Sequence, residues 1–142
     1  MRVRAVLIAL ACTVGLVAGP AQAAGGLHVK PLGWHVYTPT AGLHTVKNTK
    51  TFKACATDPV NEIYLKGKVT GAKKGKKFVE TWRLDGVKQF TTDAKWDKSG
   101  SFTDYFGYAP GATIPNGTWT VTLTRSGTKF GSGKVTLATK VC

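Results

Sequence analysis

Apolar and polar residues alternate along the second half of the chain, and this period of two predicts β-strands rather than helices. In FVETWRL, residues 78–84, the period places Phe, Glu, Trp and Leu on one face and Val, Thr and Arg on the other. In TWTVTLT, residues 118–124, it places Trp119, Val121 and Leu123 opposite a row of threonines. No amphipathic helix stands out after residue 23. The pattern therefore predicts an all-β chain, rich in the threonine, valine and aromatic residues that favour strands.

Seven strands are predicted after residue 50, and turn residues separate them. Asp85-Gly86 and Ser126-Gly127 are predicted to be tight turns. The strands are 51–57, 62–71, 78–84, 87–92, 99–108 and the two arms of a hairpin within 114–138. Short strands at this spacing favour a single immunoglobulin-like antiparallel β-sandwich.

The run from TWRLDGVKQF (81–90) through SGSFTDYF (99–106) to the hairpin within 114–138 resembles a known class of module. It is similar to the immunoglobulin-like and fibronectin-III-like modules of small secreted bacterial proteins, in particular those of actinobacteria. In such modules a hairpin carrying xLDG is followed by xPxGxYxVxLxxxGxxxxxGxxxV, and Trp119 occupies the aromatic position of that last hairpin. The resemblance covers about residues 77–137 and implies a fold rather than an activity. The chain lacks the Cys…Trp…Cys spacing of true immunoglobulin domains.

The first 23 residues are predicted to be a secretory signal peptide. Two arginines precede an uncharged, mostly apolar run, and residues 21–23 form a small-x-small cleavage site. The apolar run breaks at Gly19-Pro20 and is too short for a transmembrane helix, which needs about 20 residues. An alternative is a lipoprotein anchored through Cys12, although Ala9 stands where such signals carry leucine. We expect cleavage after residue 23 and a secreted, extracellular protein.

The stretch from residue 24 to residue 49 is predicted to be an N-terminal extension or an edge strand. It contains short apolar patches, but Pro31 and Pro39 interrupt it, and proline is excluded from central strands because it lacks an N–H to donate. The chain is therefore divided into a signal peptide (1–23), this extension (24–49) and one sandwich domain (50–142).

Two of the three cysteines, Cys55 and Cys142, remain after signal cleavage, and they allow one intramolecular pairing. Export to an oxidising compartment favours a disulfide between them. The bond closes a loop of 88 residues, which stabilises the fold by about 4–5 kcal/mol in the chain-entropy model. The alternative is an intermolecular bond through an exposed C-terminal thiol.

No motif in the sequence points to catalysis or to a cofactor. The chain has no nucleophile elbow, phosphate-binding loop or HExxH sequence, and no dedicated nucleic-acid motif. The histidines are spaced by 7 and 9 residues, which matches no compact metal-ligand pattern; they are His28, His35 and His44. We therefore predict that the protein is not an enzyme and binds no metal or cofactor. The alternative is a small secreted hydrolase built on carboxylates near the KWDKSGSF loop, namely Asp93, Asp97 or Asp104.

Charge is the main indication of function. The full chain carries a formal net charge of +13, and loss of the two arginines in the signal peptide leaves 18 basic against 7 acidic residues, or +11. Four lysines cluster in GAKKGKK, namely Lys73, Lys74, Lys76 and Lys77. They are predicted to bind an anionic polymer such as teichoic acid or an acidic polysaccharide. The alternative is that lysine only keeps the protein soluble and blocks edge-to-edge pairing of sheets.

Trp96 lies between lysine and aspartate in a predicted loop, and we expect its ring to be partly exposed. An exposed indole stacks on sugar or base faces, so Trp96 is a candidate stacking contact. The competing interpretation is that Trp96 covers an open edge of the sandwich. The leading hypothesis is thus a secreted, basic, non-enzymatic binding module. The second hypothesis is an adhesion or inhibitor domain that binds an unknown protein through its loops.

Overall fold

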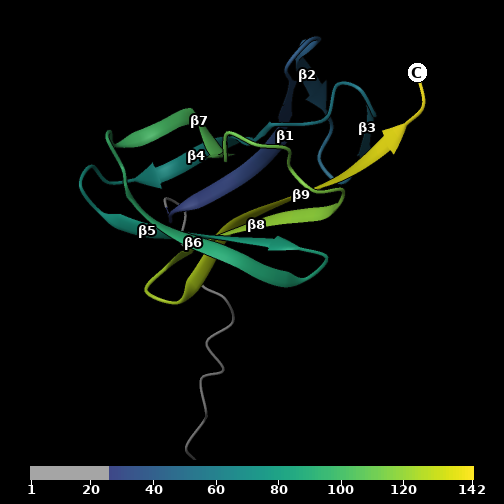
Figure 1. Ribbon diagram of the computed structural model, residues 1–142. Coiled ribbons are helices and arrows are strands. Elements are labelled where there is room, and N and C mark those ends of the chain that lie inside the picture. The colour runs from purple at the N-terminus through teal and green to yellow at the C-terminus, as the bar shows by residue number, and fades with distance from the viewer. Residues whose placement is uncertain (1–25) are drawn as a thin grey trace, which may run out of the picture.

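The structure, a computed structural model, describes residues 26–142 and consists of β-strands and their connections (Figure 1). The predicted signal peptide and the Cys12 lipid anchor lie outside the described residues. Within residues 26–142 there is no helix long and apolar enough to span a membrane. The all-β prediction is confirmed. The strands are β1 (His28–Thr38), β2 (Gly42–Val46), β3 (Thr51–Cys55), β4 (Glu62–Ala72), β5 (Lys77–Leu84), β6 (Val87–Lys95), β7 (Gly100–Tyr108), β8 (Gly117–Arg125) and β9 (Thr128–Lys140).

The strands form one continuous ladder that folds over into two packed layers. The ladder runs β6-β5-β8-β9-β1-β4-β7, with β2 beside β1 and β3 beside β9. It folds over between β9 and β1, where a single parallel pair, Val29 and Gly131, joins the layers. Figure 1 shows β1, β4 and β7 above the layer of β5, β6, β8 and β9. This two-layer arrangement is the immunoglobulin-like sandwich that the resemblance implied.

The N-terminal segment is central in the fold, which corrects the expectation of an extension or edge strand there. β1 pairs with β4 from His28 to Tyr37 and with β2 from Trp34 to Thr38, so it has neighbours on both sides. The predicted strand at 51–57 is instead the short β3, which is added in parallel beside the end of β9. The N-terminal segment is therefore part of the sandwich itself, and residues 51–55 form a short strand beside β9.

A bulge and two glycines explain how a segment with a proline becomes a central strand. The pairing of β1 with β4 shifts register between Pro31 and Gly33, so the proline lies at an irregularity, where a missing N–H is tolerated. Gly67 and Gly131 lie so close to Val29 that a Cβ on either would come within 2.7 Å of its side chain. Because those side chains are absent, Val29 reaches the core, where it is 1% exposed.

The two predicted hairpin turns are confirmed. Strands β5 and β6 meet at Asp85-Gly86, with φ angles of 49° and 81°, and β8 and β9 meet at Ser126-Gly127, with 50° and 77°. Positive φ at both central residues gives the turn whose twist matches that of paired strands. The Asp85 carboxylate also accepts a hydrogen bond from the Thr118 amide at 2.8 Å, which fastens the first hairpin to β8.

Aromatic rings fill the space between the two layers. Trp34 from β1 and Trp82 from β5 are fully buried, and they meet edge to face with ring centroids 6.0 Å apart. Trp119 from β8 is also buried, and its Nε1 donates to the carbonyl of Pro115 at 2.9 Å. Because each indole removes a large apolar area from water, these rings supply much of the core's stability.

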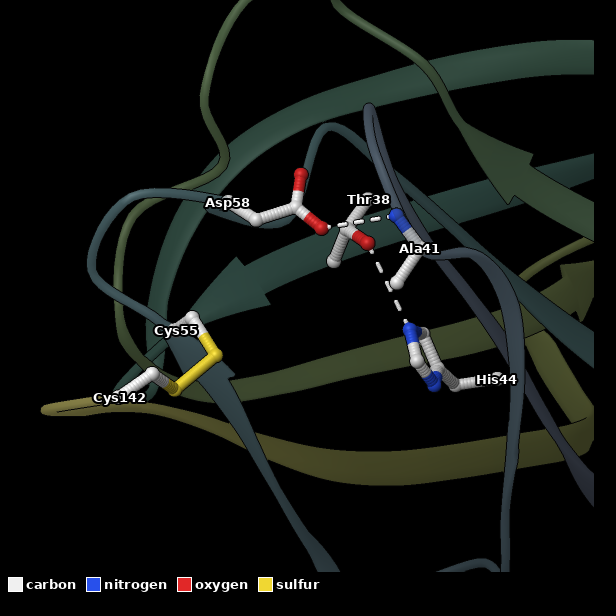
Figure 2. The surroundings of a disulfide bond; sticks show 6 residues. All are labelled: Thr38, Ala41, His44, Cys55, Asp58 and Cys142. Carbon is white, nitrogen blue, oxygen red and sulfur yellow. Dashed lines mark hydrogen bonds between the residues drawn. A yellow bond between two sulfur atoms is a disulfide. The ribbon is translucent and has the colours of Figure 1, made fainter.

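The predicted disulfide between Cys55 and Cys142 is present, and it fastens the C-terminus to the end of β3 (Figure 2). β3 runs parallel to the last residues of β9, and the Ala56 amide donates to the Lys140 carbonyl at 3.1 Å. Val141, between this strand pair and the disulfide, is 96% exposed. The bond therefore holds an end of the chain that packing alone leaves in solvent.

Asp58 fastens the β1–β2 hairpin to the segment that carries Cys55 (Figure 2). Its carboxylate oxygens accept hydrogen bonds from the amides of Thr40 at 2.8 Å and Ala41 at 2.9 Å. Burial raises the pKa of Asp58, but hydrogen bonds from the Thr38 hydroxyl and from these two amides lower that pKa by more. The pKa of Asp58 therefore lies below its ordinary value, and the ionised carboxylate is the form that holds the hairpin.

Candidate anion-binding site

Three of the four predicted lysines lie in the connection between β4 and β5, and the fourth, Lys77, is the first residue of β5; all four are exposed. The connection is a tight turn in which the Lys76 amide donates to the Lys73 carbonyl at 3.1 Å. Gly75 at its centre has a φ of 80°, a conformation that glycine adopts without strain. The turn therefore holds Lys73, Lys74, Lys76 and Lys77 close together on the surface at one end of the sandwich.

Backbone hydrogen bonds join this turn to the loop that connects β6 and β7. The Gly75 amide donates to the Trp96 carbonyl at 2.8 Å, and the Trp96 amide donates to the Lys76 carbonyl at 3.1 Å. The Lys74 amide donates to the Ser99 hydroxyl at 2.9 Å. The two connections therefore form one surface rather than two independent loops.

This junction adds two lysines that the sequence reasoning missed. Lys95 pairs directly with Lys77 across β5 and β6. Lys98 lies in the joined loop, with its Nζ 4.6 Å from the centroid of the Phe102 ring. The sequence carried no signal for this pair, because counting back from the Asp85-Gly86 turn places Ala94 opposite Lys77. A register shift between Trp82 and Arg83 moves the pairing by one residue and brings Lys95 there. We call the resulting surface the lysine end; it consists of Lys73, Lys74, Lys76, Lys77, Lys95 and Lys98, with one carboxylate, Asp97, in the same loop.

Trp96 is a core residue, so the expectation that its ring is partly exposed is wrong. The side chain is 2% exposed and stacks on Phe78, with ring centroids 4.2 Å apart. Phe102, Phe106 and Phe130 lie within 6.2 Å of the same ring, measured between centroids. The backbone bonds to Gly75 and Lys76 draw the start of the loop inward and cover the indole. Trp96 therefore packs in the core beneath the lysine end, and its ring is not accessible to a ligand.

The histidines and the other polar groups of β1 and β2 do not converge. His35 lies beside the Tyr105 ring, 5.0 Å between centroids, and His44 lies 3.5 Å from the Thr38 hydroxyl. Burial, and then the positive charge of Lys66, lowers the pKa of His35. Across residues 26–142 no three His, Cys, Asp or Glu side chains are grouped so that they could hold a metal ion.

Glu80 is a carboxylate with a raised pKa that the sequence reasoning did not single out. It lies on the inner face of β5, half-buried, and its Oε2 accepts a hydrogen bond from Trp82 Nε1 at 3.2 Å. Burial raises the pKa of Glu80, the Trp82 hydrogen bond partly offsets that rise, and the negative charge of Asp104 on β7 raises the pKa further. Asp93 and Asp97 are exposed on β6 and in the following loop.

We expect Glu80→Gln to stabilise the protein near pH 7 but not near pH 4. Because the folded-state pKa of Glu80 is raised, the folded protein holds this proton to a higher pH than the unfolded chain does. Stability is therefore lost as the pH rises from the ordinary value of 4.5 through the folded-state pKa. Glutamine keeps an acceptor for Trp82 Nε1 and carries no charge. Urea denaturation of both proteins at the two pH values measures the difference.

Asp93→Asn is the matched control for that experiment, because it also removes one negative charge but from an exposed position on the neighbouring strand. For each variant, the quantity to compare is its stability relative to the unmodified protein at pH 7 minus the same quantity at pH 4. If this difference is no larger for Glu80→Gln than for Asp93→Asn, burial does not penalise the Glu80 carboxylate.

Comparison with known proteins identifies no family for this chain. No family model and no curated protein matches the sequence. Among solved structures, an immunoglobulin-like protein from Pseudomonas aeruginosa is similar to this chain, with a TM-score of 0.47 and 11% sequence identity. The match covers 79% of this chain and 96% of that one. At this identity the likeness concerns the fold alone.

Proposed function

We propose that the protein is a secreted, non-enzymatic module that binds anionic polymers of the cell envelope or the extracellular space, with the lysine end as its contact surface. The observation that carries the proposal is the joining of two connections into one surface with six exposed lysines. Teichoic acids and acidic polysaccharides are the polymers of matching charge. The disulfide supports the secreted location, because such bonds persist in oxidising compartments.

The arrangement of the lysine end favours binding over a purely solubilising role. Lys77 and Lys95 lie directly opposite each other on paired strands, and like charges in that position are destabilising. Lysines that only kept the protein soluble would serve equally well at separate positions. A polyanion laid across this end would neutralise the repulsion between the two ammonium groups. Six neighbouring charges also present a field that attracts a polyanion from a distance.

The proposed binding is electrostatic, and we expect charge neutralisation at the lysine end to weaken it strongly. The test is co-sedimentation of the purified protein with isolated cell walls at low salt. Replacing Lys73, Lys74, Lys76 and Lys77 by glutamine should weaken adsorption by roughly tenfold or more, because each exposed charge pair contributes about 0.2–1 kcal/mol. Glutamine keeps most of each side chain's length, so the turn itself should persist.

A matched control separates the lysine end from net charge. Glutamine at four other exposed lysines, one each from β1, β3, β4 and β9, makes the same change in total charge; these are Lys30, Lys53, Lys68 and Lys140. We expect this control variant to lose roughly threefold or less. Equal losses in the two variants would contradict a localised site, and unchanged adsorption in both would point to the alternative of a protein partner.

A further inference from the structure

The outer face of the layer that contains β5, β8 and β9 carries a shallow hollow of about 300 Å³. Its floor consists of hydroxyl-bearing side chains from two strands, and three cationic side chains stand around it. These are Thr120, Thr122 and Ser132 on the floor, and Arg83, Lys129 and Lys134 around it. None of the described residues that line the hollow is acidic or aromatic. Its volume lies at the lower end of the range of about 300–1,000 Å³ for small-molecule sites.

Strand register places these groups in two ordered rows. Arg83 pairs with Thr120 on β8, and Thr120 pairs with Lys134 on β9, so a hydroxyl lies between two cations. In the next row Thr122 pairs with Ser132. Neighbouring strands are about 4.8 Å apart, so the cations of the first row are anchored about 10 Å apart. An anionic group and several hydroxyls of one small molecule fit between side chains at that spacing.

Asn48 and Thr49 also line the hollow, and we call them its rim. Asn48 holds this rim in place. Its Oδ1 accepts two hydrogen bonds, from Trp34 Nε1 at 3.1 Å and from the Lys134 amide at 2.9 Å. These two donors determine which end of the amide is oxygen, and they leave the Nδ2 group as the donor that Asn48 presents. The rim is therefore anchored directly to the buried core through Trp34.

Thr49, the next rim residue, has an unusual backbone. Its φ of 67° is in the left-handed region, which a β-branched residue rarely adopts. The conformation is held by a hydrogen bond from the Thr49 amide to the Lys134 carbonyl at 2.7 Å. Strained residues persist where the surrounding structure determines them, and they concentrate at binding sites. This strain is a second observation, independent of the charges, that points to the same hollow.

We propose that the hollow binds a single anionic sugar or polyol unit, one that carries a carboxylate or a phosphate. The Arg83 guanidinium and the Lys134 ammonium bind the anionic group, because a planar guanidinium pairs with two oxygens at once. Thr120, Thr122 and Ser132 exchange hydrogen bonds with the hydroxyls of the ligand. The inference rests on the proposed function, from which it takes the anionic polymer as the ligand. It adds the chemistry of the repeating unit that the hollow would bind. Its residues are separate from the lysine end, so either site can fail without the other.

The test is an NMR titration of the ¹⁵N-labelled protein at physiological salt with glucuronate and with glycerol 3-phosphate, which distinguish a carboxylate from a phosphate. Glucose and glycerol are the neutral counterparts. We expect one of the two anions to cause saturable shifts at residues 48–49, 120–122 and 132–134, with at least tenfold weaker binding of its neutral counterpart. Shifts confined to the lysine end would overturn this inference and leave the proposed function standing.

Two variants sharpen the result. Arg83→Gln should weaken binding of the anion by about tenfold or more, and Thr122→Val, which removes one hydroxyl and keeps the shape, by roughly threefold to tenfold. Lys53→Gln removes an exposed charge outside the hollow and is the control for Arg83→Gln. Amide spectra with unchanged dispersion show that each variant is folded. Equal weakening by Lys53→Gln and Arg83→Gln would also overturn the inference, and so would the absence of saturable shifts with both anions.

Discussion

Replacing both Cys55 and Cys142 by serine should lower the free energy of unfolding by about 4–5 kcal/mol, the largest effect we expect from any surface change. The disulfide joins residues 87 positions apart, so without it the unfolded chain gains a large amount of conformational freedom. The folded state changes little by comparison, because β3 and β9 stay paired through their backbone. Equilibrium denaturation in urea of the two proteins measures the difference.

The same experiment in the presence of a reductant is the control. The unmodified protein should then lose as much stability as the double-serine variant, and the variant should not respond to the reductant. The alternative, intermolecular bond predicts instead that reduction converts dimers into monomers of unchanged stability, and that outcome would contradict the intramolecular bond. Hydrogen exchange at the end of β9 adds a local readout, because fraying of residues 136–140 accompanies loss of the bond.

Replacing Trp34 by alanine should lower the free energy of unfolding by about 3–5 kcal/mol, as is typical for a large buried aromatic residue. The ring is fully buried, packs on Trp82 edge to face at 6.0 Å and donates to Asn48. Its removal leaves a cavity between the layers and leaves Asn48 Oδ1 with the Lys134 amide as its remaining donor. Urea denaturation followed by the fluorescence of the remaining tryptophans measures the loss.

Leu32→Ala on the same strand is the matched control. Leu32 is 48% exposed, so its truncation should change stability by no more than about 0.5 kcal/mol. The two variants together test whether β1 is a central strand. If the segment from residue 24 to residue 49 were an extension outside the core, both truncations would have equally small effects.

The strands after residue 50 could be predicted because their pattern is local. Alternation across 78–84 and 118–124, with turns at Asp85-Gly86 and Ser126-Gly127, predicts both hairpins with their inward faces. β1 could not be predicted in the same way, because its central place depends on partners far along the chain. The bulge at Pro31 and the small size of Gly67 and Gly131 admit it, and neither signal is visible without knowing which strands meet.

The candidate site was predictable only in part, for the same reason. A run of lysines in a turn is visible in the sequence, so Lys73 to Lys77 were found. The burial of Trp96 was not, because it follows from backbone bonds between two connections that lie about 20 residues apart in sequence. The hollow was missed because its residues come from strands that are far apart in the sequence. Only the strand register brings Arg83 of β5 and Lys134 of β9 to either side of Thr120 of β8.

The salt dependence of adsorption to isolated cell walls tests the proposed function most directly. Exposed charges are screened within about 8 Å at physiological ionic strength and within about 30 Å at 0.01 M. We expect the unmodified protein to sediment with the walls at low salt and to be released as the salt approaches the physiological value. Failure to bind at low salt, or binding that persists unchanged through the series, would contradict attraction between the lysine end and an anionic polymer.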